Sequence, residues 1–141
     1  MTYNLSRFLE AQKNDYTIAF EEIKSGHKRS HWIWYIFPQL KGLGMSYMSD
    51  FYGLDGLGEA KAYLANDTLR ARLLEISRAL LALPEHDATS VMGYPDDMKL
   101  HSSMTIFHLA APDEPVFQKV LDKYFAGKLD KNTLEICQGN A

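Results

Sequence analysis

The chain has 141 residues, of which 46% are hydrophobic and 23% are charged, and its formal net charge is −3. This length suits one domain with a substantial core, and the composition excludes long disordered stretches. The net charge provides no general attraction to double-stranded nucleic acid or to an anionic membrane. The single cysteine, Cys137, excludes an internal disulfide and a thiolate metal site. We therefore expect residues 1–141 to form a single domain.

Two further features concern the compartment. The N-terminal residues lack the basic and then apolar pattern of a signal peptide. The longest apolar run, Trp32 to Pro38, is far shorter than the ~20 residues that span a bilayer. We expect no membrane association, and together with the single cysteine these features predict a cytoplasmic protein.

Two helices are predicted between residues 4 and 26. Asn4 and Asp15 are of a type that favours N-caps, and each precedes apolar residues at helical spacing. Gly26 lies where a helix commonly ends in the left-handed conformation. Basic residues gather near that glycine, where the helix dipole favours cations.

The next segment, His31–Phe37, is almost wholly apolar, so its pattern fits either a buried helix or a buried strand. Ser30 would cap a helix at this point, and Pro38 ends either element. We predict a helix because no other convincing strand lies nearby to pair with it. Residues 42–58 are predicted to form a loop, with one helical turn at Ser46–Phe51.

The second half of the chain has the clearest helical periodicity. A short helix is predicted over Glu59–Ala65. Asn66 and Asp67 then precede a long helix that Pro84 ends. Further helices are predicted over Met98–Ala111, Asp113–Ala126 and Asp130–Cys137, with Asp130 as the cap of the last one. Their apolar stripes predict a core formed by Leu69, Leu73, Ile76, Leu80, Phe117, Leu121 and Phe125. About seven helical segments without a convincing strand pair predict an all-α fold.

Three stretches carry a family resemblance: RFLEAQ at 7–12, GHKRSHWIWYIFPQL at 26–40 and PDDMKLHSSMT at 95–105. On these residues the chain resembles a bacterial family catalogued as domain of unknown function 1810, over roughly residues 4–136. The resemblance implies a mainly helical domain and implies no activity. Members often carry the label calpastatin, which looks like a misnaming. Calpastatin inhibitory segments are disordered, whereas this chain has two tryptophans, eight tyrosines and seven phenylalanines.

The first candidate binding cluster consists of Arg29, Ser30, His31, Trp32 and Trp34. The Arg29 guanidinium would hold a phosphate or carboxylate, and a helix N-terminus at Ser30 would add backbone donors. An indole would stack on a flat ring of the ligand. In the alternative interpretation the cations follow a helix C-terminus, and the tryptophans belong to the core.

The second candidate cluster consists of Lys99, Ser102 and Ser103, which helical spacing makes neighbours. A desolvated lysine beside a hydroxyl can activate a nucleophile, but the Ser-x-x-Lys order of serine–lysine enzymes is reversed here. Burying such polar groups without partners costs a few kcal/mol each. We therefore predict that the two clusters face each other across a concavity that binds an anionic, phosphate- or nucleotide-like molecule. The residues expected to line it are Arg29, His31, Lys99 and Ser102.

No metal or cofactor is predicted, because His101 and His108 would lie two helical turns apart, roughly 10 Å. Two alternatives to the small-molecule pocket stay open. One is an interaction module whose basic and aromatic surface meets another protein or single-stranded nucleic acid. The other is a structural helical domain without a ligand. The sequence does not decide whether the protein is an enzyme.

Overall fold

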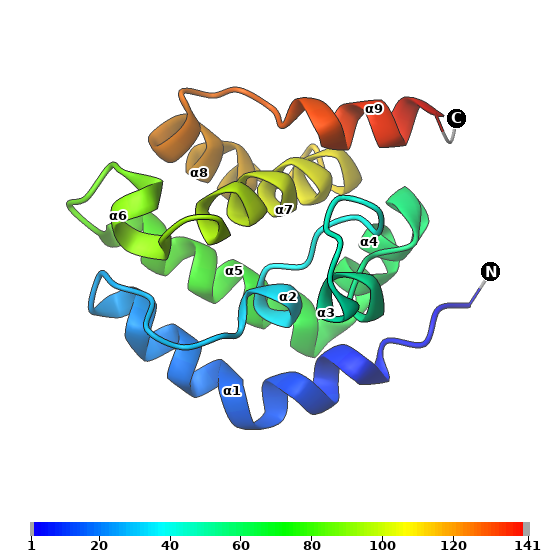
Figure 1. Cartoon of the computed structure of the whole chain (residues 1–141), viewed down its shortest axis with the longest axis horizontal. Helices are drawn as coiled ribbons and strands as arrows, with labels where there is room; N and C mark the ends of the chain where they lie inside the picture. The colour runs from blue at the N-terminus through cyan, green and yellow to red at the C-terminus, as the bar shows by residue number, and fades with distance from the viewer. Residues whose placement is uncertain (1, 140–141) are drawn as a thin grey trace.

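The structure, a computed structural model, describes residues 2–139, and these residues contain nine helices (Figure 1). The helices are α1 (Ser6–Lys24), α2 (Ile33–Ile36), α3 (Tyr47–Phe51), α4 (Gly56–Ala65), α5 (Asp67–Ala82), α6 (Ala88–Met92), α7 (Asp96–Ala110), α8 (Pro115–Phe125) and α9 (Lys131–Gly139). No strand occurs in the described part of the chain, which has one isolated parallel bridge between Leu40 and Leu54. The predicted all-α fold is confirmed.

Helix α7 runs through the middle of the molecule and packs against α2, α4, α6, α8 and α9 (Figure 1). Helix α5 packs against α1, α4 and α8 and so completes the core. Six of the seven residues of the predicted core belong to one hydrophobic cluster, and the seventh packs against it. Six are fully buried, and Phe125 packs on the edge of the cluster, where its ring stacks on His101. The apolar periodicity therefore identified the helix faces correctly.

Helix α5 has the predicted N-cap at Asn66, and α3 has an N-cap at Ser46 that the sequence-based prediction did not include. The Asn66 side chain accepts a hydrogen bond from the Leu69 N–H at 3.0 Å, and Ser46 accepts one from the Ser49 N–H at 3.1 Å. These bonds satisfy donors that the first turn of a helix leaves unpaired. The short helix α6, which Asp87 caps in the same way, is missing from the sequence-based prediction.

Other predicted boundaries are wrong. Helix α1 is continuous, because Asp15 does not cap a second helix and instead accepts a hydrogen bond from the Tyr35 hydroxyl. Asparagine and aspartate are weak helix formers but do not break a helix. Helix α2 is a single turn, and the Ser30 hydroxyl does not cap it. Helix α8 begins at Pro115 after a Glu114 cap.

The segment between α2 and α4 is held close to the core. Its two ends pair through the Lys41 N–H to the Leu54 carbonyl and the Leu54 N–H to the Gln39 carbonyl, both at 2.9 Å. A Cβ atom at Gly53 would lie 2.7 Å from the Lys41 Cα, so only glycine fits at this close approach. These contacts fix the position of Gln39 beside α7.

Candidate functional site

The donors of the first predicted cluster are used within the protein. The Glu22 carboxylate on α1 accepts hydrogen bonds from the Arg29 and Ser30 N–H groups at 2.7 and 2.9 Å. It also accepts from the Ser30 hydroxyl at 2.5 Å and from the Trp32 indole at 2.9 Å. The anion that these groups bind is therefore the protein's own side chain. We call Glu22, Ser30, Trp32 and the Arg29 N–H the Glu22 cluster.

The electrostatics of the Glu22 cluster follow from these contacts. Burial raises the pKa of the Glu22 carboxyl, but hydrogen bonds from Ser30, Arg29 and Trp32 lower it by more, from an ordinary 4.5 to about 2. Glu22 is thus ionised at neutral pH without a cation in hydrogen-bond contact. Its four donors stabilise the charge and hold the segment before α2 against α1.

Three residues of the first cluster do not have their predicted roles. The side chains of Arg29 and His31 are exposed, and neither lines the cavity described below. Trp32 is 1% exposed and belongs to the core, as in the alternative interpretation. The predicted four-residue concavity therefore does not form. The indoles also do not make the flat exposed surface expected of an interaction module.

The two predicted clusters nevertheless meet, through other atoms. Lys28 forms an ion pair with Asp96 on α7, with 2.7 Å between Nζ and Oδ2. Lys99 lies 3.8 Å from the other oxygen of the same carboxylate, and its ammonium sits 5.1 Å from the centre of the Trp34 ring. Two lysines thus share one aspartate.

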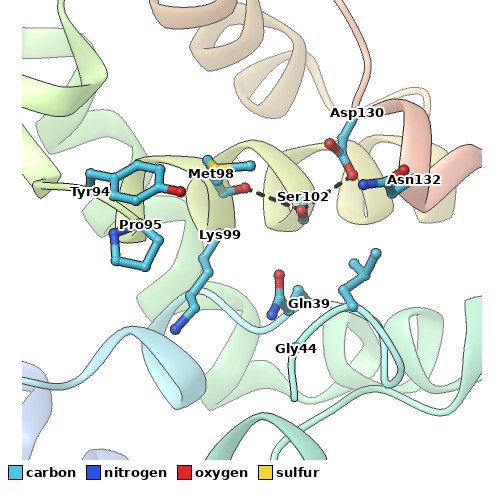
Figure 2. A pocket seen from close by; sticks show the side chains of 10 residues that line it. Gln39, Gly44, Tyr94, Pro95, Met98, Lys99, Ser102, Asp130 and Asn132 are labelled. Atoms are coloured by element: carbon cyan, nitrogen blue, oxygen red, sulfur yellow. Dashed lines mark hydrogen bonds between the residues drawn. The ribbon is translucent and has the colours of Figure 1, made fainter. Parts of the chain in front are cut away.

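A cavity of about 270 Å³ lies beside this trio, between the first turns of α7, the segment after α2 and the start of α9 (Figure 2). Lys99 and Ser102 of the second predicted cluster line it. Ser103 is fully buried and does not, and its hydroxyl has no hydrogen-bond partner among the described residues. We call this space the α7 cavity. Its other lining residues are Gln39, Leu43, Gly44, Tyr94, Pro95, Met98, Asp130 and Asn132.

The α7 cavity has a cationic and an anionic end. Figure 2 shows the Lys99 side chain extending from α7 toward the segment that carries Gln39, with Asp130 and Asn132 beyond Ser102. Asp130 Oδ2 accepts from the Thr133 N–H at 3.0 Å, the Thr133 hydroxyl at 2.6 Å and the Ser102 hydroxyl at 3.3 Å. The Ser102 hydroxyl also lies 3.1 Å from the Met98 carbonyl.

Gln39 is the least solvated amide of the α7 cavity. Its side chain faces α7 near Ser102, yet no hydrogen bond joins it to the other residues drawn in Figure 2. The residue is only 8% exposed. The amide nitrogen and oxygen still reach solvent, because the fully buried polar atoms without a partner in the described residues are those of Trp34, Ser103 and His108. This pattern is typical of a group that meets a ligand or ordered water.

Sequence reasoning missed several lining residues. Asp130 is predicted only as a helix cap, a role that it fills. Gln39 follows Pro38 in the stretch that carries the family resemblance, where it reads as a residue after a helix end. Tyr94 and Met98 lie on the rim and are exposed. The packing of α9 against α7 brings Asp130 to the cavity, and the packing of α2 against α7 brings Gln39 there.

Residues 2–139 contain no candidate metal cluster and no candidate membrane-spanning helix. No group of three or more histidine, cysteine, aspartate or glutamate side chains there is placed to hold a metal ion. Within the same residues, every helix is too short or too polar to cross a bilayer.

Comparison with known proteins agrees with the resemblance seen in the sequence. Among curated proteins, none matches this chain. The crystal structure of the conserved hypothetical protein Rv1873 from Mycobacterium tuberculosis is similar, with 40% sequence identity and a TM-score of 0.93. The similarity covers 95% of this chain and 96% of that one. The sequence model of the family described as protein of unknown function DUF1810 matches residues 2–137, so the chain belongs to this family.

Proposed function

We propose that the protein binds an anionic small molecule in the α7 cavity, with Lys99 as the cation that recognises it. The proposal rests on the trio of Lys28, Asp96 and Lys99, in which two ammonium groups share one carboxylate. Asp96 is closer to Lys28 by about 1 Å, since the two distances are 2.7 and 3.8 Å. One positive charge is therefore left without a close partner at the cavity wall.

The surroundings of Lys99 favour the binding of an anion at this position. Its side chain is 21% exposed, so water screens it less than it screens a surface lysine. The amide of Gln39 lies in the same cavity and offers N–H donors to a phosphate or carboxylate oxygen. Leu43, Pro95 and Met98 give the cavity an apolar part beside these polar groups, and small-molecule sites commonly combine the two.

The proposed binding residues thus differ in part from the sequence-based set. Lys99 and Ser102 are retained, and Gln39 replaces Arg29 as the second group on the anion. No reaction is proposed, because the Asp130 carboxylate beside the Ser102 hydroxyl is already occupied as the cap of α9. Ser102 lies within hydrogen-bond distance of a carbonyl and a carboxylate that already holds two other hydrogen bonds.

The test is a thermal-shift titration of the wild type and three variants with inorganic phosphate, ribose 5-phosphate and adenosine monophosphate. An anion that binds only the folded state raises the Tm in proportion to the logarithm of its concentration. Lys99→Gln should abolish the rise. Lys119→Gln, which changes an exposed lysine on α8 outside the cavity, should keep it.

Arg29→Ala is the third variant and separates the two sets of residues. If the cavity is the site, Arg29→Ala retains the phosphate-induced rise. A rise that survives Lys99→Gln, or the lack of any rise with all three compounds, would overturn the proposal.

A further inference from the structure

We infer that the ligand of the α7 cavity is a phosphorylated sugar, whose vicinal hydroxyls bind Asp130 while its phosphate binds Lys99. This inference rests on the proposed function, because it assumes an anion at Lys99. It adds the recognition of the other end of the molecule.

Hydrogen-bond acceptors are in excess around Asp130. All three hydrogen bonds to its carboxylate go to Oδ2, and Oδ1 accepts none among the described residues. An ionised carboxylate has about four acceptor positions. The Ser102 hydroxyl has a single proton and two acceptors within reach, so its own lone pairs are also free. This end of the cavity can therefore accept hydrogen bonds from a ligand.

The surroundings of Asp130 indicate what kind of hydrogen-bond donor a ligand would present to it. Asp130 has no lysine or arginine within 4.0 Å in the described residues, and its three partners are two hydroxyls and a backbone N–H. Asn132, which lines the cavity next to it, offers both an acceptor and donors. A carboxylate beside an amide matches two adjacent hydroxyls, which each donate one hydrogen bond and can accept another.

The separation of the two ends of the α7 cavity sets the length of the ligand. Lys99 and Ser102 are three residues apart on α7, which is roughly 4.5 Å along the helix axis, and Asp130 lies beyond Ser102. An α-amino acid carries its amine and carboxylate on one carbon and is too short to reach both ends. A sugar ring between a phosphate and a diol has a suitable length. The exposed ring of Tyr94 on the rim offers a surface for the C–H face of such a sugar.

The experiment compares three probes by isothermal titration: inorganic phosphate, ribose 5-phosphate and 3-aminopropyl phosphate. We expect ribose 5-phosphate to bind at least about tenfold more tightly than inorganic phosphate, as befits added hydrogen bonds to a charged group. The aminoalkyl compound should gain less. If it binds more tightly than ribose 5-phosphate, Asp130 recognises an ammonium and the sugar assignment is wrong.

Asp130→Asn is the decisive variant, because asparagine keeps the cap on α9 and removes the charge. It should lower the affinity for ribose 5-phosphate about tenfold and leave that for inorganic phosphate unchanged. Asp113→Asn, at an exposed aspartate outside the cavity, is the matched control. Circular dichroism of each variant establishes that the helices are intact.

The two proposals fail differently. Equal affinities for phosphate and ribose 5-phosphate, both lost in Lys99→Gln, would overturn the sugar and keep the anion site. Binding that does not depend on Lys99 would overturn the anion site itself.

Discussion

The Glu22 cluster and the α7 cavity both place polar groups beside strongly apolar runs, yet they resolve the cost of burial in opposite ways. In the Glu22 cluster, one carboxylate accepts four hydrogen bonds from groups that follow it closely in sequence. In the α7 cavity, the Gln39 amide and one oxygen of Asp130 lack partners among the described residues. A closed set of hydrogen bonds indicates a structural role, whereas polar groups that reach solvent in a cavity are free to bind a ligand.

The largest expected effect comes from removing the centre of the Glu22 cluster. Glu22→Ala leaves the Trp32 indole, the Ser30 hydroxyl and two N–H groups without their acceptor. We expect a loss of about 3 kcal/mol or more in the free energy of unfolding, measured by urea denaturation.

Glu21→Ala is the matched control, because Glu21 is the exposed neighbour on the same helix. It should change the stability by about half a kcal/mol or less. Similar losses for the two variants would mean that the Glu22 cluster does not hold the fold.

The next effect is a pH dependence that belongs to the Glu22 cluster. The folded pKa of Glu22, about 2, lies below its ordinary value of 4.5, so the unfolded state binds the proton more readily. Its contribution to stability is present above pH 4.5 and is lost as the pH falls toward 2. Unfolding measured from pH 6 to pH 2 should therefore lose stability more steeply in the wild type than in Glu22→Gln. Parallel curves would show that Glu22 is not the group responsible.

The fold could be predicted from the sequence where local signals and tertiary packing agree. The Asn66 cap and the stripe from Leu69 to Leu80 identify α5 because period, cap and burial indicate the same helix. The prediction failed where the local structure depends on a partner that is distant in the sequence. Asp15 has the sequence pattern of an N-cap, but in the folded protein it accepts a hydrogen bond from the Tyr35 hydroxyl. The single-turn α2 is likewise shaped by the bonds from the preceding segment to Glu22 on α1.

The candidate site was predictable only in part, for the same reason. The sequence indicates that polar groups near Trp32 and Ser102 need partners, but not which partners they find. Glu22 looks like one more charged residue on a helix surface, so the donors after it were predicted to bind a ligand. Asp130 reads as a cap alone, because the packing of α9 against α7 is not visible in a local pattern.

A smaller effect distinguishes the two lysines that share Asp96. Lys28 is 5% exposed, forms the shorter ion pair and also donates to the Ser30 carbonyl, so Lys28→Gln should cost about 2 kcal/mol of stability. Lys99 is more exposed and less closely paired, so Lys99→Gln should change the unfolding free energy by less than about 1 kcal/mol. Urea denaturation of both variants measures the difference. The reverse order would assign Lys99 to the fold and remove the basis for an anion site.

The smallest effect concerns two adjacent serines of α7. Ser102 is hydrogen bonded at the cavity wall, whereas Ser103 is fully buried with a hydroxyl that has no partner among the described residues. Ser102→Ala should lower the stability by about 1 kcal/mol, because Asp130 loses a donor. Ser103→Ala should leave the stability unchanged or raise it by up to about 1 kcal/mol, because it removes an unsatisfied polar group from the core. Thermal unfolding of the pair measures this contrast, and the control is Ser6→Ala at an exposed serine on α1. If Ser103→Ala destabilises the protein as much as Ser102→Ala does, the Ser103 hydroxyl has a hydrogen-bond partner in solution and is not an unsatisfied group of the core.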